Sequence, residues 1–197
     1  MATTLLPFRQ VHENDVVNLY ALDAGAGTRG LIVQLDSTAG WQIGDDLGTS
    51  AVSSTTYSNT VTDRYNVKAR VKAAASGRAN AVPFGMLMYD VAETDENGEK
   101  LIYHPRKAHE MQVSVSGQAV PVLTKGIVLV KVESADLGGV TPAAGTNVFA
   151  GAAGAMVCHS APETDMCRIG TCLGKTGVNG ELLVKLDFNG EYDRKWS

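Results

Sequence analysis

Short apolar runs that each follow a glycine set the strongest limit on what this chain can fold into. Three such runs lie at 29–36, 126–133 and 180–187, and each is rich in valine, leucine or isoleucine with a polar residue near its end. Runs of this kind are typical of β-strands. No apolar stripe with helical spacing continues for more than about three turns. The pattern therefore predicts an all-β protein.

Residues 64–73 alternate strictly between apolar and polar side chains. Tyr65, Val67, Ala69, Val71 and Ala73 alternate with Arg64, Asn66, Lys68, Arg70 and Lys72. A period of two predicts a strand with the two sets on opposite faces. The basic side chains would form a row along one face, with ~6.6 Å between alternate positions. Such a row either protects a sheet edge from aggregation or meets an acidic partner surface.

Turn signals separate the apolar runs at short intervals. Asn97-Gly98 and Asn179-Gly180 are dipeptides that favour tight β-hairpins. The first predicts a hairpin between strands at 84–91 and 100–103, and the second a hairpin between strands at 169–173 and 181–188. Several short strands at such spacing predict a small barrel or sandwich.

The N-terminal third of the chain has a different character. Residues 37–62 are rich in Ser, Thr, Gly and Asp, with Trp41 and Tyr57 as the only large anchors, which indicates a long loop or extended arm. We therefore expect residues 1–62 to form an N-terminal arm with short strands and a long loop, and residues 63–197 to form a β-barrel domain. The alternative is one continuous domain that also includes residues 16–36.

Both ends of the chain carry apolar side chains. Leu5, Leu6 and Phe8 lie near the N-terminus, and Trp196 is the residue before last. Chain ends are usually polar and mobile. Apolar ends favour a surface to cover, which belongs either to the same subunit or to a neighbour.

Composition and charge exclude several classes of protein. Hydrophobic residues make up 44% and charged residues 19%, which excludes a disordered, charge-driven chain. The net charge of −4 argues against nucleic-acid binding. The chain has no run of ~18 apolar residues, so the sequence does not predict a membrane-spanning helix. Residues 1–10 lack the basic start and apolar stretch of a signal peptide, so we expect synthesis in a cytoplasm.

Three cysteines cluster near the C-terminal end and raise the question of a metal site. Cys158, His159, Cys167 and Cys172 could form a zinc site by residue type. Zinc sites usually use close pairs such as Cys-x2-Cys, which this segment lacks. We therefore expect these cysteines to be small buried hydrophobes, with no metal and no other cofactor.

Three further patterns bear on catalysis or nucleotide binding. The segment 170–176 resembles a phosphate loop but is one residue too short between its glycines, so a tight hairpin turn is the better interpretation. Gly25, Gly27 and Gly30 match Gly-x-Gly-x-x-Gly, but an apolar run typical of a strand follows instead of a helix, which favours a β-turn loop. His104 and His109, the latter beside Glu110, could act as general bases, yet no nucleophile elbow accompanies them.

Residues 113–188 combine strands and turns in a recognisable order. A Val-x-Thr-x-Gly start leads into an apolar strand, a Gly-x-x-Val turn follows, and an Ile-Gly pair precedes a last apolar strand. The residues that carry this order are Thr124, Gly126, Val130, Gly145, Val148, Ile169, Gly170, Gly180, Val184 and Leu186. In this order the chain resembles the capsid decoration, or cement, proteins of tailed bacteriophages.

The resemblance implies a small β-barrel or β-tulip-like module that sits as a homotrimer on the outer surface of the virion capsid. It implies that the major capsid protein is the partner, with no catalysis. Binding only to the assembled shell would stabilise that shell by mass action. We take these residues as candidates for the partner interface: Leu5, Leu6, Phe8, Trp41, Arg64, Lys68, Arg70, Lys72 and Trp196.

Two other functions remain open from the sequence. One is a small oligomeric β-barrel hydrolase that uses His104 or His109 near a subunit junction. It requires a concave site that holds one of these histidines together with a carboxylate. The other is a head-fibre or tail component, which would favour a sugar-binding aromatic platform, although aromatic residues are only 6% of the chain.

Overall fold

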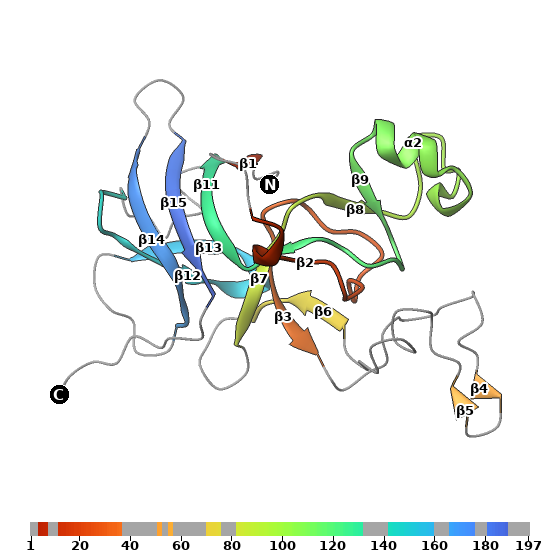
Figure 1. The fold of residues 1–197 in the computed structure, drawn as a ribbon, viewed down its shortest axis with the longest axis horizontal. Coiled ribbons are helices and arrows are strands. Elements are labelled where there is room, and N and C mark those ends of the chain that lie inside the picture. Colours follow the sequence, from red (N-terminus) through yellow and green to blue (C-terminus); the bar gives the residue numbers. More distant parts are fainter. Residues whose placement is uncertain are drawn as a thin grey trace.

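The computed structural model describes residues 4–7, 12–36, 51–52, 55–56, 70–75, 82–131, 142–159, 166–175 and 181–188. These residues form two larger antiparallel sheets that lie side by side (Figure 1). The six-stranded sheet has the order β1 (Thr4–Pro7), β11 (Lys125–Lys131), β15 (Leu182–Asp187), β14 (Arg168–Lys175), β12 (Asn147–Ala150), β13 (Met156–His159). The five-stranded sheet has the order β2 (Val16–Val17), β10 (Val122–Leu123), β7 (Pro83–Leu87), β3 (Ile32–Asp36), β6 (Arg70–Ala73).

Smaller elements complete the described fold. The strands β4 (Ala51–Val52) and β5 (Thr55–Thr56) form an antiparallel pair, and β8 (Asp90–Ala92) and β9 (Val113–Val115) form a parallel pair. The α-helix among the described residues is α2 (Pro105–Glu110). The 3-10 helices are η1 (Glu13–Asp15), η2 (Leu101–Tyr103) and η4 (Ala152–Gly154).

The all-β class predicted from the sequence is confirmed. Both larger sheets are open within the described ranges, because β1 and β13 are the edges of one and β2 and β6 the edges of the other. Strands β1, β2 and β3 precede residue 63, yet they pair with β11, β10, and β6 and β7 respectively, all of which follow it.

The five-stranded sheet is buried on both faces, which explains the continuous apolar runs of its strands. Ile32, Met86 and Leu123 point into a core shared with the six-stranded sheet. Their neighbours Val33, Leu87 and Val122 point into a second core on the opposite face. Successive strand residues face opposite sides, so a strand with two buried faces needs apolar residues at adjacent positions.

A single residue connects the two sheets between β10 and β11. Thr124 N–H and Thr124 Oγ1 donate to Asp15 O at 2.8 and 2.9 Å, and Thr124 O accepts from Phe188 N–H at 3.2 Å. The chain therefore passes from one sheet to the other in one step, with its backbone held from both sides.

The three glycine-led runs are confirmed as strands β3, β11 and β15. The pairing expected across Asn179-Gly180 is also confirmed, because β14 and β15 are antiparallel neighbours. Residues 170–175 belong to β14, so the hairpin turn expected over 170–176 is wrong for that part. The loop expected around Gly25, Gly27 and Gly30 is confirmed, because 23–31 contains bends and turns before β3.

The strand expected at 100–103 is wrong. The turn at Asn97-Gly98 is present, with Gly98 at φ 82, but the chain then forms η2 and α2. Tyr103 N–H and His104 N–H donate back to Lys100 O and Leu101 O, which winds the backbone instead of extending it. Pro105 then starts α2, where its fixed φ and missing N–H cost nothing.

The alternating segment 64–73 is described only from Arg70 onward, where it forms β6. The strand predicted for this end is confirmed, with Val71 and Ala73 alternating with Arg70 and Lys72, but Arg70 is only 9% exposed while Ala73 is exposed. Arg70 Nε lies 2.7 Å from Asp23 Oδ1 and 3.9 Å from Asp36 Oδ2, and Lys72 Nζ lies 3.2 Å from Asp36 Oδ2. Arg70 and Lys72 therefore both form ion pairs with aspartates of this chain.

Replacing Ile32 with alanine is expected to lower the free energy of unfolding by about 3 kcal/mol. Ile32 is fully buried in the core that both sheets share, so truncation leaves a cavity between them. The change is measurable as a shift in the urea midpoint. Leu35→Ala on the same strand is the control, because Leu35 is 43% exposed and its loss should cost less than about 1 kcal/mol. Equal shifts for both variants would contradict the shared core.

Candidate functional site

Residues 93–112, which we call the insertion, connect β8 to β9 and lie at one end of the molecule beyond the five-stranded sheet (Figure 1). Together with β9 they have a small core of their own. Leu101, Ala108 and Val115 are buried there, with Ile102 and Met111 packed against them. The insertion is a compact unit held to the sheets through the β8–β9 pair.

A cavity of about 730 Å³ lies between α2, β9 and the neighbouring strands. Its apolar lining comes from both sheets and the insertion: Met88, Ala108, Val113, Val115, Leu123 and Val128. Its polar lining carries amide, hydroxyl, imidazole and guanidinium groups: Asn18, Arg29, His109, Gln112, Ser114 and Gln118. An apolar cavity of this size with a few polar groups has the character of a binding site.

The charged side chain in the lining is already paired. Arg29 Nε and Arg29 Nη2 donate to Asp90 Oδ2 at 3.2 and 3.1 Å, and Arg29 N–H donates to Asp90 Oδ1 at 2.7 Å. Three bonds to one carboxylate hold Arg29 in a fixed, charge-balanced position. The guanidinium therefore adds no net charge to the cavity.

Gln112, at the junction of α2 and β9, has a strained backbone. Its φ is 55, in the left-handed region that costs a non-glycine residue about 1 kcal/mol. The strained residue also lines the cavity. Backbone strain gathers at functional sites, because the surrounding structure must be built to hold it.

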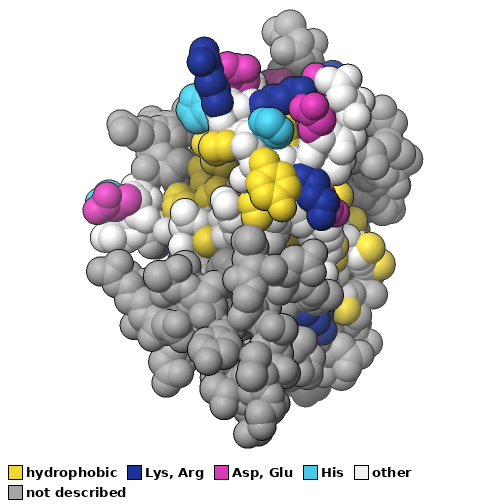
Figure 2. All heavy atoms as spheres, turned by 90° about the vertical axis from the view of Figure 1, so that its right-hand side faces the viewer, with side chains coloured by type: hydrophobic (Ala, Val, Ile, Leu, Met, Phe, Trp, Pro, Cys, Tyr) yellow, Lys and Arg dark blue, Asp and Glu magenta, His cyan; other side chains and the backbone are white. Residues whose placement is uncertain are grey.

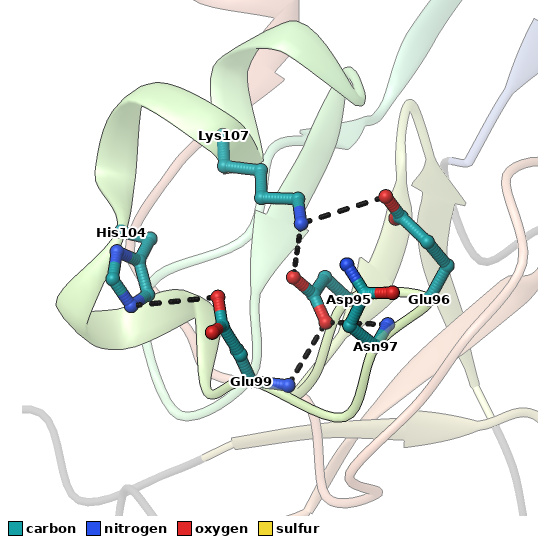
Figure 3. A network of polar contacts seen from close by, with 6 residues as sticks. All are labelled: Asp95, Glu96, Asn97, Glu99, His104 and Lys107. Carbon is teal, nitrogen blue, oxygen red and sulfur yellow. Dashed lines mark hydrogen bonds and ion pairs between the residues drawn. The ribbon is translucent and has the colours of Figure 1, made fainter.

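A buried carboxylate organises the insertion (Figure 3). Asp95 Oδ1 accepts from the N–H groups of Asn97 and Glu99 at 2.8 and 2.9 Å, and Asp95 Oδ2 accepts from Lys107 Nζ. Lys107 Nζ also lies 3.4 Å from Glu96 Oε1. The Asp95 side chain is completely shielded from solvent. One carboxylate thus closes the Asn-Gly turn and ties it to α2.

These contacts shift the ionisation of both partners. The hydrogen bond from Lys107 lowers the pKa of Asp95, and the backbone N–H groups of Glu99 and Asn97 lower it further against the opposing effect of burial. The hydrogen bond to Asp95 raises the pKa of Lys107. Both shifts favour the charged pair in the folded state.

We expect acid to loosen the insertion before the rest of the molecule. Because folding lowers the pKa of Asp95 from 3.8, its stabilising contribution is present above that value and is lost as pH falls below it. Protection factors of the Asn97 and Glu99 amides, each referred to intrinsic exchange at the same pH, should fall between about pH 6 and about pH 2.5. Asp95→Asn, which cannot ionise, should show low protection at both pH values. Unchanged protection in the natural chain would contradict the prediction.

The solvent-facing surface at this end mixes charge and aromatic character. Figure 2 shows basic, acidic and histidine side chains gathered over one part of the face with hydrophobic side chains between them. Tyr103 is 72% exposed and Tyr89 45% exposed. His104 Nε2 lies 3.9 Å from Glu99 Oε2 and forms an ion pair when it is protonated.

The two histidines of the hydrolase hypothesis lie at opposite ends of α2. His109 lines the cavity, and the described residues that line it include no Asp or Glu. His104 precedes α2 and pairs with Glu99 at an exposed position. The residues that line this cavity therefore do not place a histidine beside a carboxylate.

The partner-interface candidates fall into three groups. Leu5 and Leu6 belong to edge strand β1, opposite Val130 and Leu129 of β11. Arg70 and Lys72 belong to β6 and pair with acidic residues of this chain. The others lie outside the described residues: Phe8, Trp41, Arg64, Lys68 and Trp196.

The three cysteines are buried and free, as expected from the absence of a close pair among them. Cys158 and Cys172 belong to the core of the six-stranded sheet. Burial raises the pKa of Cys158 to about 11, with a smaller contribution from Cys172. Within the described ranges, no group of three or more His, Cys, Asp or Glu side chains is placed to hold a metal ion.

Arg29, Asp90, Asp95 and Lys107 were missed as site residues by sequence reasoning. The signal for Asp95 was present, because an aspartate before Asn-Gly commonly accepts hydrogen bonds from its own turn. The pairing of Arg29 with Asp90 spans residues far apart in the chain, and no local pattern indicates it.

Comparison with known proteins places this chain in no group. No protein-family model, curated protein or solved structure matches it. None of the helices in the described part of the chain has the length and apolar character to cross a membrane.

Proposed function

We propose that this chain is a capsid decoration protein of a tailed bacteriophage, which binds the outer surface of the assembled capsid and bridges major capsid subunits. The observation that carries the proposal is the β4–β5 pair, which lies apart from both larger sheets (Figure 1). A second line of support is the order of strands and turns in residues 113–188, which resembles the order in decoration proteins.

The β4–β5 pair is too short to be stable by itself, so its position away from the larger sheets is informative. It has two residues in each strand, and an isolated two-stranded hairpin is marginally stable at best in water. Such a hairpin gains stability when it lies on another surface. A protein in which this hairpin lies apart from the larger sheets can use it to bind a neighbouring capsid subunit. The free energy of that contact then stabilises the assembled capsid.

The finer architecture belongs to the same proposal. A β-tulip-like module in a homotrimer would place three copies of the hairpin around one axis, each over a different capsid subunit. Three linked contacts raise the overall affinity well beyond that of one. The native mass by sedimentation should then be three times 20.8 kDa.

The test is the thermal stability of expanded capsids of the encoding phage, measured by calorimetry with and without saturating protein. We expect the added chain to raise the melting temperature of the capsid. A variant in which residues 51–56 are replaced by a Gly-Ser linker of equal length should bind weakly and leave that temperature unchanged. Unchanged capsid melting with the natural chain at saturation would refute the function.

A further inference from the structure

Strand β8 uses both of its edges, and this fixes how it pairs with β9. Val91 N–H donates to Gly27 O at 2.7 Å, and Gly27 N–H donates to Val91 O at 3.0 Å. In a parallel ladder alternate residues bond to opposite sides. Asp90 and Ala92 therefore supply the bonds from β8 to β9.

The alternation continues into β9. Ser116 N–H donates to Ala92 O at 2.9 Å, and Ser114 lies opposite Val91. Ser114 and Ser116 consequently face β8, and the backbone groups of Val113 and Val115 face the other side. Val115 O accepts from Gln118 N–H at 3.2 Å. Within the described residues, Val113 N–H, Val113 O and Val115 N–H have no backbone partner.

The residues of β9 line the cavity described above, and we infer that the open side of the strand faces it. Val113, Ser114 and Val115 all line it, with the side-chain amides of Gln112 and Gln118 nearby. The unused groups of β9 are two donors and one acceptor in strand spacing. That set matches the edge of another extended polypeptide.

We propose that the cavity is a strand-addition site, in which an extended segment of a partner polypeptide pairs with the outer edge of β9. The backbone of the segment bonds to Val113 and Val115, and its alternate side chains enter the apolar floor formed by Met88, Leu123 and Val128. Strand addition gains affinity from main-chain bonds and selectivity from the alternate side-chain pockets.

The lining specifies the character of that segment. Arg29 is neutralised by Asp90, so the site has no charge pattern that favours a strongly acidic or basic partner. The amides of Asn18, Gln112 and Gln118 can donate to and accept from a peptide backbone. The expected occupant is therefore an uncharged, extended segment with alternating apolar residues. This inference does not depend on the capsid proposal.

Selection from a displayed library of random octapeptides against the full-length chain supplies the probe. We expect the enriched peptides to alternate apolar and small polar residues. When the strongest of them is added to the protein, hydrogen exchange followed by NMR should slow at the Val113 and Val115 amides. The Ser114 amide, which already faces β8, should keep its rate and serves as the internal control.

Two sets of variants separate backbone pairing from other binding. N-methylation of the peptide at the single position whose N–H donates to Val113 O should weaken binding about tenfold, because the methyl removes the donor that this acceptor needs. Methylation at the alternate positions should have little effect. Gln118→Trp, at an exposed position that lines the cavity, should also weaken binding about tenfold. Tyr103→Ala, on the exposed tip of η2, should not.

Three results would overturn the proposal. One is the absence of any enriched peptide, and another is equal affinity for the peptide methylated at the position opposite Val113 O and for peptides methylated at the alternate positions. The third is protection of Val113 and Val115 in the free protein that disappears on dilution, since a second copy of this chain would then occupy the edge. The methylated peptides need only the natural chain, so the test stands even if Gln118→Trp fails to fold.

Discussion

Gly170→Ala is expected to destabilise the six-stranded sheet by about 3 kcal/mol or more, although alanine replaces glycine in a strand. Gly170 lies in the centre of that sheet, opposite Leu186 of β15 and Val148 of β12. A Cβ added there would meet Lys185 O well inside contact distance and would lie 3.2 Å from Leu186 Cα. Both obstacles are backbone atoms, so the clash cannot be relieved by a side-chain rotation.

Urea unfolding followed by circular dichroism measures the loss. Gly145→Ala is the matched control, because nothing lies within 4 Å of an added Cβ there and the cost comes from its φ of +90 alone. That cost should be about 1 kcal/mol. A smaller loss at Gly170 than at Gly145 would show that β14 and β15 can separate to admit a methyl group.

Arg70→Met is expected to cost about 3 kcal/mol, because Asp23 loses the nearly buried cation beside it and Asp36 loses one of its two basic neighbours. Arg70 Nε approaches Asp23 Oδ1 to 2.7 Å without the alignment of a hydrogen bond, so the contact is electrostatic. The Asp36 side chain is only 6% exposed. Methionine keeps the length of the side chain and removes the charge, which isolates the ionic contribution from packing.

Lys72→Met on the same strand is the control for the Arg70 variant. The Lys72 side chain is 38% exposed, so its pair with Asp36 is well solvated and should contribute less than about 1 kcal/mol. Thermal unfolding of both variants in low and high salt gives the comparison. Equal losses would mean that Arg70 acts as one more surface cation, as the sequence had suggested.

The burial of Arg70 shows what the sequence could not predict, namely which distant residues pack against a strand. Strands β3, β11 and β15 were predicted correctly because their apolar runs carry their own signal. A charge on an alternating strand is expected to face solvent, and only long-range contacts bring Asp23 and Asp36 to cover it. Periodicity describes one strand and says nothing about which neighbour closes its polar face.

The insertion was missed for a related reason. Helix α2 has six residues, too few to show a helical stripe, and its one local signal was Pro105 at the first position. Its stability comes from packing on Leu101 and Val115 and from the bond between Lys107 and Asp95. A short helix of this kind is held by tertiary contacts and leaves little trace in the sequence.

The one-residue passage at Thr124 has a mechanical consequence. A longer connection would act as slack and let the two sheets tilt against each other under load. Here Asp15 and Phe188 grip the connecting residue from the two sides, so a pull on the edge of one sheet is transmitted directly to the other. The body of the protein should behave as one stiff block that resists stretching and shear until it gives way all at once.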